Sequence, residues 1–133
     1  QFREASCAAT ANPFSGAEAD APETPIGHEI SLSASNFAAW VFAFGGDIYD
    51  YENNQYTLNT TAAVEAMTFV QGLVADGCAR IQTDPRAFSA QVNFGLGTTL
   101  FTIASSSGIP FYALAASRDL GDGTLEPRFT WSA

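Results

Sequence analysis

Apolar residues recur along this chain with two different periods, and each period predicts its own kind of element. The longest helical pattern runs from Thr60 to Asp76, where Val64, Met67, Val70 and Val74 return every three or four residues. That spacing places an apolar stripe on one face of a helix. We therefore expect a long amphipathic helix over Thr60–Asp76, with Asn59 as its N-cap and Gly77 at its C-terminal end.

Shorter stretches share the helical spacing or carry helix-start residues. Further helices are predicted over residues 2–10, from the cluster 33–36 to Phe44, over 85–94, and over 108–116, where Pro110 fits the first turn.

Strand patterns are short and are separated by turn residues. Strands are expected over 27–32, 100–103 and 128–132, with a β-hairpin formed by 47–51 and 55–58. Residues 100–103 read as a buried strand, and residues 12–25 as a surface loop. The chain has 133 residues, enough for one domain with a modest core. The expected fold is therefore a single helix-rich α/β (α+β) domain over residues 1–133, with a small sheet.

The charge balance narrows the range of partners. The formal net charge is -9, which repels the backbone of nucleic acids and anionic membrane surfaces. No apolar run approaches the roughly 20 residues that a membrane-spanning helix requires. We expect no nucleic-acid partner and no membrane span in this chain.

The two cysteines, Cys7 and Cys78, lie far apart in the sequence. In a cytosolic protein they would be two buried thiols, whereas in an exported protein they would form a disulfide that closes a long loop. Neither lies beside a histidine or a second cysteine, which disfavours a zinc or redox site. We favour the Cys7–Cys78 disulfide, on the condition that the protein is exported.

One strand-to-helix turn carries most of the candidate chemistry. Ser105, Ser106 and Ser107 follow the predicted strand 100–103 and precede a predicted helix. The first N–H groups of a helix have no partner within it, so such a turn can receive an anion or a hydroxyl group. The alternative is that the serines only cap the helix.

The sequence offers little for catalysis or for a metal. It has one histidine, His28, which is more typical of a structural residue, and no nucleophile or nucleotide motif. The acidic residues Asp47, Asp50 and Glu52 lack the glycine and final glutamate of a calcium loop. We expect binding without chemistry: no catalytic residues, no metal and no cofactor.

The order of several short motifs resembles the extracellular solute-binding proteins of ABC importers, in the family that binds sugars and glycerol phosphates. The matching stretches are 36–40 (Asn-Phe-Ala-Ala-Trp), the double glycine 45–46, the hairpin start 47–50, Asn59 with 63–67, the helix end 74–77, and the Phe-x-x-Gly element with its strand, small residues and helix over 94–108. Residues 1–5 resemble the tail of a further helix of this family.

The resemblance implies a two-lobed protein that closes on its solute. This chain would be most of the second lobe, truncated at both ends. The implied partners are a small-molecule solute and ABC permease subunits, and the implied location is extracytoplasmic, in the periplasm or anchored at the cell surface.

The resemblance also implies a set of ligand-binding residues. In the glycerol-phosphate branch a Ser-Ser-Gly turn touches the ligand, and aromatic residues near the Asn-Phe-x-x-Trp segment line the cleft. Carried over to this sequence, the candidates are Ser105, Ser106, Ser107, Gly108, Ser35, Asn36 and Trp40. Phe111 and Tyr112 depart from that branch and offer a stacking face for a sugar ring, so Tyr112 joins the candidates. A carbohydrate-active enzyme lobe and a partner-binding module are the alternative functions.

Overall fold

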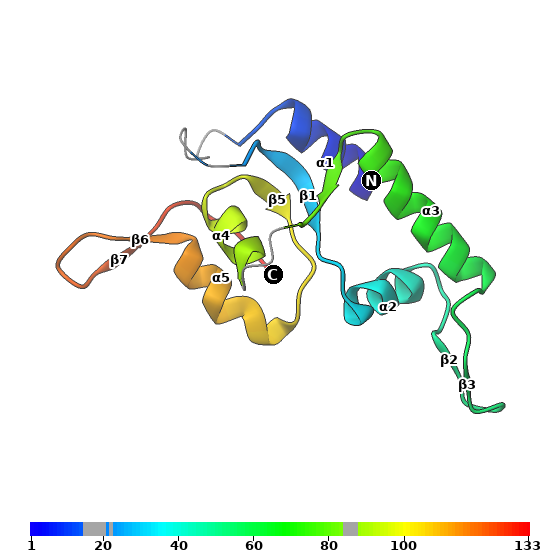
Figure 1. Cartoon of the computed structure of the whole chain (residues 1–133). Coiled ribbons are helices and arrows are strands. Elements are labelled where there is room, and N and C mark those ends of the chain that lie inside the picture. Colours follow the sequence, from blue (N-terminus) through cyan, green and yellow to red (C-terminus); the bar gives the residue numbers. More distant parts are fainter. Residues whose placement is uncertain (15–20, 22, 84–87) are drawn as a thin grey trace.

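The centre of the molecule is a three-stranded parallel sheet with the order β4-β1-β5 (Figure 1). The computed structural model describes residues 1–14, 21, 23–83 and 88–133. In the sheet, β1 (Ile26–Ile30) lies between β4 (Ala79–Ile81) and β5 (Thr99–Phe101). The register pairs His28 with Ala79 on one side and with Phe101 on the other.

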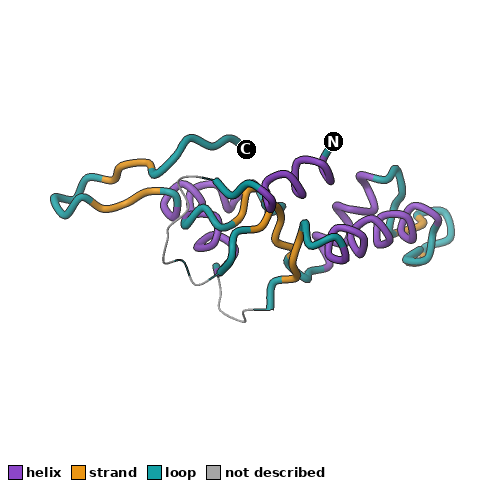
Figure 2. Tube along the Cα trace, turned by 90° about the horizontal axis from the view of Figure 1, so that it is seen from above, coloured by secondary structure: helices purple, strands orange, loops and turns teal. Residues whose placement is uncertain are grey.

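Helices surround this sheet, and two small hairpins lie farther from it (Figure 1). The described helices are α1 (Phe2–Ala11), α2 (Ala34–Ala43), α3 (Thr61–Ala75), α4 (Ser89–Gly95) and α5 (Ile109–Ala115), with a short 3₁₀ turn at Ser106–Gly108. The hairpins are β2 (Tyr49–Asp50) with β3 (Gln55–Tyr56), and β6 (Ser117–Asp119) with β7 (Leu125–Pro127). Helix α1 packs across β1, α2 packs on α3, and α4 packs on α5. The two hairpins project from opposite ends of an elongated molecule (Figures 1 and 2).

Most of the expected helices are present, with changed boundaries. The predicted cap Asn59 is wrong: the N-cap of α3 is Thr60, whose extended backbone lets its hydroxyl accept the N–H of Ala63 at 3.2 Å. Gly77 is confirmed at the C-terminal end with φ +69°, a conformation that favours glycine. Of the predicted helix 85–94, residues 85–87 lie outside the described residues, and α4 begins at Ser89.

Of the three strands predicted outside the hairpin, two are confirmed and one is wrong. The strand near 27–32 is confirmed as β1, and the one near 100–103 as β5, although the side chain of Leu100 is 47% exposed. The strand predicted over 128–132 is wrong, because the hairpin partner of β6 is β7, immediately before it. Strand β4 was not predicted.

The disulfide between Cys7 and Cys78 is present, with the two Cα atoms 4.4 Å apart. It joins α1 to the start of β4, and the hydroxyl of Ser6 donates to the carbonyl of Cys78 at 2.6 Å beside it. The same region holds the main apolar cluster, which contains Ile30, Trp40, Ala66, Leu73, Cys78 and Ala79. A smaller cluster of Phe94, Tyr112 and Ala116 holds α4 and α5 together. Among the described residues, no helix has the length and apolar character needed to cross a membrane.

His28 is a buried structural residue at the centre of the sheet. Its Nδ1 donates to the carbonyl of Phe101 at 2.9 Å, and its ring contacts the rings of Phe2 and Trp40. Desolvation by burial lowers the pKa of His28 from the ordinary value of 6.5, despite an opposing contribution from its bond to Phe101. The imidazole is therefore neutral in the folded protein near neutral pH.

Replacing both Cys7 and Cys78 by serine should lower the free energy of unfolding by about 4 kcal/mol on the chain-entropy model. The reason is that the unfolded chain gains conformational entropy when the cross-link between two residues 71 positions apart is removed. Urea denaturation measures this loss. A reductant should produce a similar loss in the unaltered protein and none in the double variant. Equal midpoints for the reduced and oxidised protein would contradict a stabilising bridge.

Stability should fall as the pH drops below about 6.5, because the unfolded chain then binds a proton at His28 that the folded protein resists. The loss continues until the pH reaches the lowered pKa of the folded state. The urea midpoint, measured from about pH 7.5 to about pH 5.5, tests this. His28→Gln should be less stable throughout but flatter over this range; an unchanged slope in that variant would assign the pH dependence elsewhere.

Candidate functional site

An open groove runs along the edge where the three parallel strands end. Because the strands are parallel, the residues that follow them meet at one edge of the sheet, where α/β proteins commonly bind ligands. Ser31 follows β1, Gln82 follows β4, and Ile103 to Ser105 follow β5; all of these line the groove. Its volume is about 380 Å³. Helix α2 contributes its first turn to one wall, and α4 contributes its first turn to another.

The lining is rich in neutral hydrogen-bonding groups. The residues are Ser31, Ser33, Ser35, Asn36, Gln82, Phe88, Ser89, Ala90, Gln91, Ile103, Ala104, Ser105 and Tyr112. None of these described residues carries a charge at neutral pH. The described part of the groove lining can therefore donate and accept hydrogen bonds without presenting a fixed charge to a ligand.

Side-chain hydrogen bonds hold these groups in place. The amide oxygen of Gln82 accepts from the hydroxyl of Ser31 at 3.1 Å, and its nitrogen donates to the hydroxyl of Ser89. The amide nitrogen of Asn36 donates to the carbonyl of Ser31 at 3.0 Å. Gln82 thus bridges the end of β1 and the start of α4.

Four of the predicted site residues, Ser35, Asn36, Ser105 and Tyr112, line this groove together. Ser35 and Ser105 are exposed, whereas Tyr112 is buried and its hydroxyl lies 3.0 Å from that of Thr102. Ser105 is therefore the residue of the predicted serine turn that lines the groove.

The rest of the predicted serine turn lies beside the groove. Ser106, Ser107 and Gly108 form the 3₁₀ turn before α5, and they are not among its lining residues. The hydroxyl of Ser105 accepts the N–H of Ser107 at 3.3 Å, which is the capping role that the sequence left open. The side chain of Ser105 therefore caps the 3₁₀ turn, and the residue also lines the groove.

Trp40, which the family resemblance made a candidate, is not among the residues that line the groove. Its side chain is only 8% exposed, and its ring packs against those of Phe2 at 5.6 Å and Phe69 at 5.7 Å. The helical spacing that puts Phe37 and Val41 on the inner face of α2 also turns the indole inward. An exposed aromatic pair lies elsewhere: Phe88, on the groove, stacks on Phe111 with centroids 5.8 Å apart.

A second hollow of about 240 Å³ adjoins the groove and shares Gln82 with it. It contains a buried ion pair: the guanidinium of Arg80 donates to Glu29 through Nε at 3.2 Å and Nη2 at 2.9 Å. The side chain of Glu29 is 2% exposed, and Asn93 donates to both of its carboxylate oxygens. This network joins β1, β4 and α4, and so fixes the wall of the groove that α4 provides.

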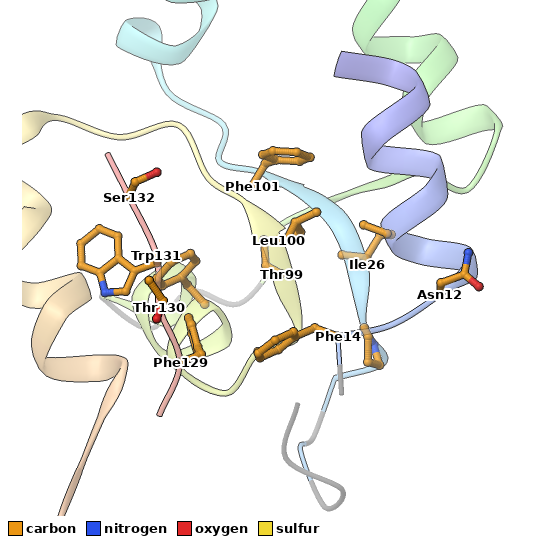
Figure 3. A pocket seen from close by; sticks show the side chains of 14 residues that line it. Asn12, Phe14, Ile26, Thr99, Leu100, Phe101, Phe129, Thr130, Trp131 and Ser132 are labelled. Atoms are coloured by element: carbon orange, nitrogen blue, oxygen red, sulfur yellow. The ribbon is translucent and has the colours of Figure 1, made fainter. Parts of the chain in front are cut away.

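A third pocket, of about 450 Å³, has a different character (Figure 3). It lies near the start of β1 and β5 and is walled largely by apolar side chains, among them Phe14, Ile26, Leu100, Phe129 and Trp131. No predicted site residue lines it.

Within the described part of the chain, one group of potential metal ligands is close together, Cys7, Asp76 and Cys78. Both sulfur atoms are bonded to each other, and Asp76 pairs with Arg3. These three residues are therefore engaged in other bonds.

Sequence reasoning missed Ser31, Gln82, Ser89 and Gln91 as groove residues. The available signal was their position: polar residues directly after a strand or at the start of a helix. This signal could not identify Gln82, because β4, the strand that it follows, was not predicted.

No protein-family model, curated protein or solved structure matches this chain.

Glu29→Gln should lower the free energy of unfolding by roughly 3–5 kcal/mol, because it leaves the charge of Arg80 without its buried partner. Glu126→Gln is the matched control: it breaks the exposed pair with Arg118 and should cost less than about 1 kcal/mol. Chemical denaturation of both variants gives the comparison. Similar small losses in the two would show that the buried pair does not hold the sheet and α4 together.

Proposed function

We propose that this chain is one lobe of an extracytoplasmic solute-binding protein of an ABC importer, and that its groove binds an uncharged sugar. The observation that carries the proposal is the groove at the carboxyl edge of the sheet, lined with hydroxyl and amide groups and free of charge among its described residues. Sugar hydroxyls donate and accept hydrogen bonds, and such neutral groups match them.

The choice of a sugar over a sugar phosphate or glycerol phosphate rests on the absence of an arginine or lysine among the described lining residues of the groove. Arginine and lysine side chains are the usual charged partners of phosphate groups in proteins. Arg80, in the adjoining hollow, already donates to Glu29 and to the carbonyl of Thr24. The exposed stacked pair of Phe88 and Phe111 offers an apolar surface of the kind on which the C–H face of a sugar ring packs.

Two further features are compatible with this role. A disulfide persists in oxidising, extracytoplasmic surroundings. The groove is open on one side, as a site would be that is completed when a second lobe closes over it. The permease partner rests on the family resemblance alone.

An enzymatic lobe remains the second candidate function from the sequence, but no specific observation favours it. Glycoside hydrolysis uses two carboxyl groups across the bond that is cut. The described groove residues offer hydroxyls and amides, and no carboxyl group is among them.

In the protein that carries this chain, the double variant Ser35→Ala/Ser105→Ala should weaken sugar binding roughly five- to tenfold or more, because it removes two hydrogen-bonding groups of the groove. A thermal-shift screen of neutral sugars, sugar phosphates and glycerol 3-phosphate selects the solute, and calorimetry gives the dissociation constants. Ser106→Ala/Ser107→Ala, outside the lining, is the matched control and should bind normally. Tighter binding of the phosphates would overturn the choice of ligand, and equal losses in the two variants would overturn the site.

A further inference from the structure

The hairpin of β2 and β3 is an isolated projection with an aromatic face. Its two strands pair only with each other among the described strands, and it extends away from the body beyond α2 and α3 (Figures 1 and 2). A two-stranded hairpin in water is marginally stable by itself. We therefore expect contacts between side chains of the two strands to stabilise the hairpin.

Three tyrosines share one face of the hairpin. Tyr49 lies opposite Tyr56 in the strand register, and Tyr51 is two residues along from Tyr49. The ring of Tyr49 makes edge-to-face contacts with Tyr51 at 5.0 Å and with Tyr56 at 5.2 Å. Tyr51 is nonetheless 81% exposed and Tyr56 73% exposed. These three residues form what we call the tyrosine face: the central ring supports two outer rings that remain open to solvent.

The turn of the hairpin fixes this arrangement. The carboxylate of Asp50 accepts the N–H groups of Glu52 and Asn53 at 2.9 and 3.0 Å, and the side-chain amide of Asn53 at 2.7 Å. The hydroxyl of Tyr49 bonds to the side chain of Asn54. The outer rings therefore stand on a pre-organised support, which reduces the entropy lost when a partner covers them.

The surroundings of the tyrosine face are negative. Asp47, Asp50 and Glu52 lie on the hairpin, and the sequence contains no lysine or arginine between Glu4 and Ala79. The side-chain amide of Asn53, together with backbone N–H groups, lowers the pKa of Asp50, so that its carboxylate stays charged into the acidic range. A cationic partner is attracted to this end of the molecule, whereas a second copy of the chain or an anionic membrane is repelled.

We propose that the tyrosine face is a docking surface for an arginine-bearing segment of a partner protein. Guanidinium groups stack flat on phenol rings and donate to carboxylates. The rings are on the tyrosine face, and Asp47, Asp50 and Glu52 lie on the same hairpin. Lysine matches the charge but not the planar stacking. Tyrosines with few rotatable bonds are efficient contact residues in protein interfaces. The inference is independent of the groove and of its ligand.

The test uses the whole chain and fluorescent octapeptides of alternating arginine and glycine, with lysine–glycine and glutamate–glycine peptides for comparison. Fluorescence anisotropy at low ionic strength should show the arginine peptide binding more tightly than the lysine peptide, and the glutamate peptide not at all. Tyr51→Ser/Tyr56→Ser should weaken arginine-peptide binding roughly tenfold while leaving the net charge unchanged. The matched control is Leu120→Ser/Leu125→Ser, which alters exposed apolar residues of the other projecting hairpin and should bind normally.

Two further variants keep the result clear if the double tyrosine variant unfolds the hairpin. Tyr51→Phe/Tyr56→Phe retains the rings and should retain most of the binding, whereas Glu52→Gln should weaken it several-fold without altering a ring. Equal affinity for the arginine and lysine peptides, together with indifference to the tyrosine variants, would mean attraction to the net charge and would overturn the proposal. Self-association of the chain that disappears in the tyrosine variant would also overturn it, because the occupant would then be a second copy.

Discussion

The position of β1 between two parallel neighbours is the constraint on which the rest of the structure depends. Its hydrogen bonds to β4 and β5 bring together segments that are far apart in the sequence. The ladder continues past the strands, since the N–H of Gln82 donates to the carbonyl of Ile30 at 2.9 Å. Without this register, Ser31, Gln82 and Ser105 would not meet at one edge. The groove is thus a product of strand pairing rather than of any single motif.

The packing against β1 leaves little space for larger side chains in this strand. Gly27 lies so close to α1 that an added Cβ would fall 2.0 Å from the carbonyl oxygen of Ser6. The N–H of Gly27 donates to the hydroxyl of Thr10 at 2.9 Å, and the disulfide ties the same helix to the residue that precedes β4. Next in the strand, His28 and Glu29 are both buried and both hydrogen-bonded. A buried polar group that loses its partner is costly, so these contacts specify one register.

The sequence predicted the helices well because their apolar spacing is long enough to be read locally, as in α3. Some of the predicted site residues line the groove. Ser35, Asn36 and Ser105 stand at helix starts and strand ends, which local patterns mark. Trp40 could not be placed from its spacing alone, since core and rim positions both suit an aromatic residue on an amphipathic helix.

The failures come from short or context-dependent elements. Strand β4 has three residues and follows directly on the turn at Gly77, so it offers too few alternating positions to detect. The segment 128–132 alternates like a strand, but its aromatic residues Phe129 and Trp131 pack on Phe94 instead of joining a sheet. Tertiary packing overrides local preference in such cases. In β4 and in segment 128–132, contacts with residues distant in the sequence determine the local structure.

Helix α2 has one further consequence. Its first turn forms a wall of the groove, and its last turn leads through Gly45 and Gly46 into the hairpin that bears the tyrosine face. Ten helical residues span about 15 Å as a stiff rod. A tilt of this rod imposed at one end must displace the other end as a lever does. One stiff element therefore joins the groove to the hairpin.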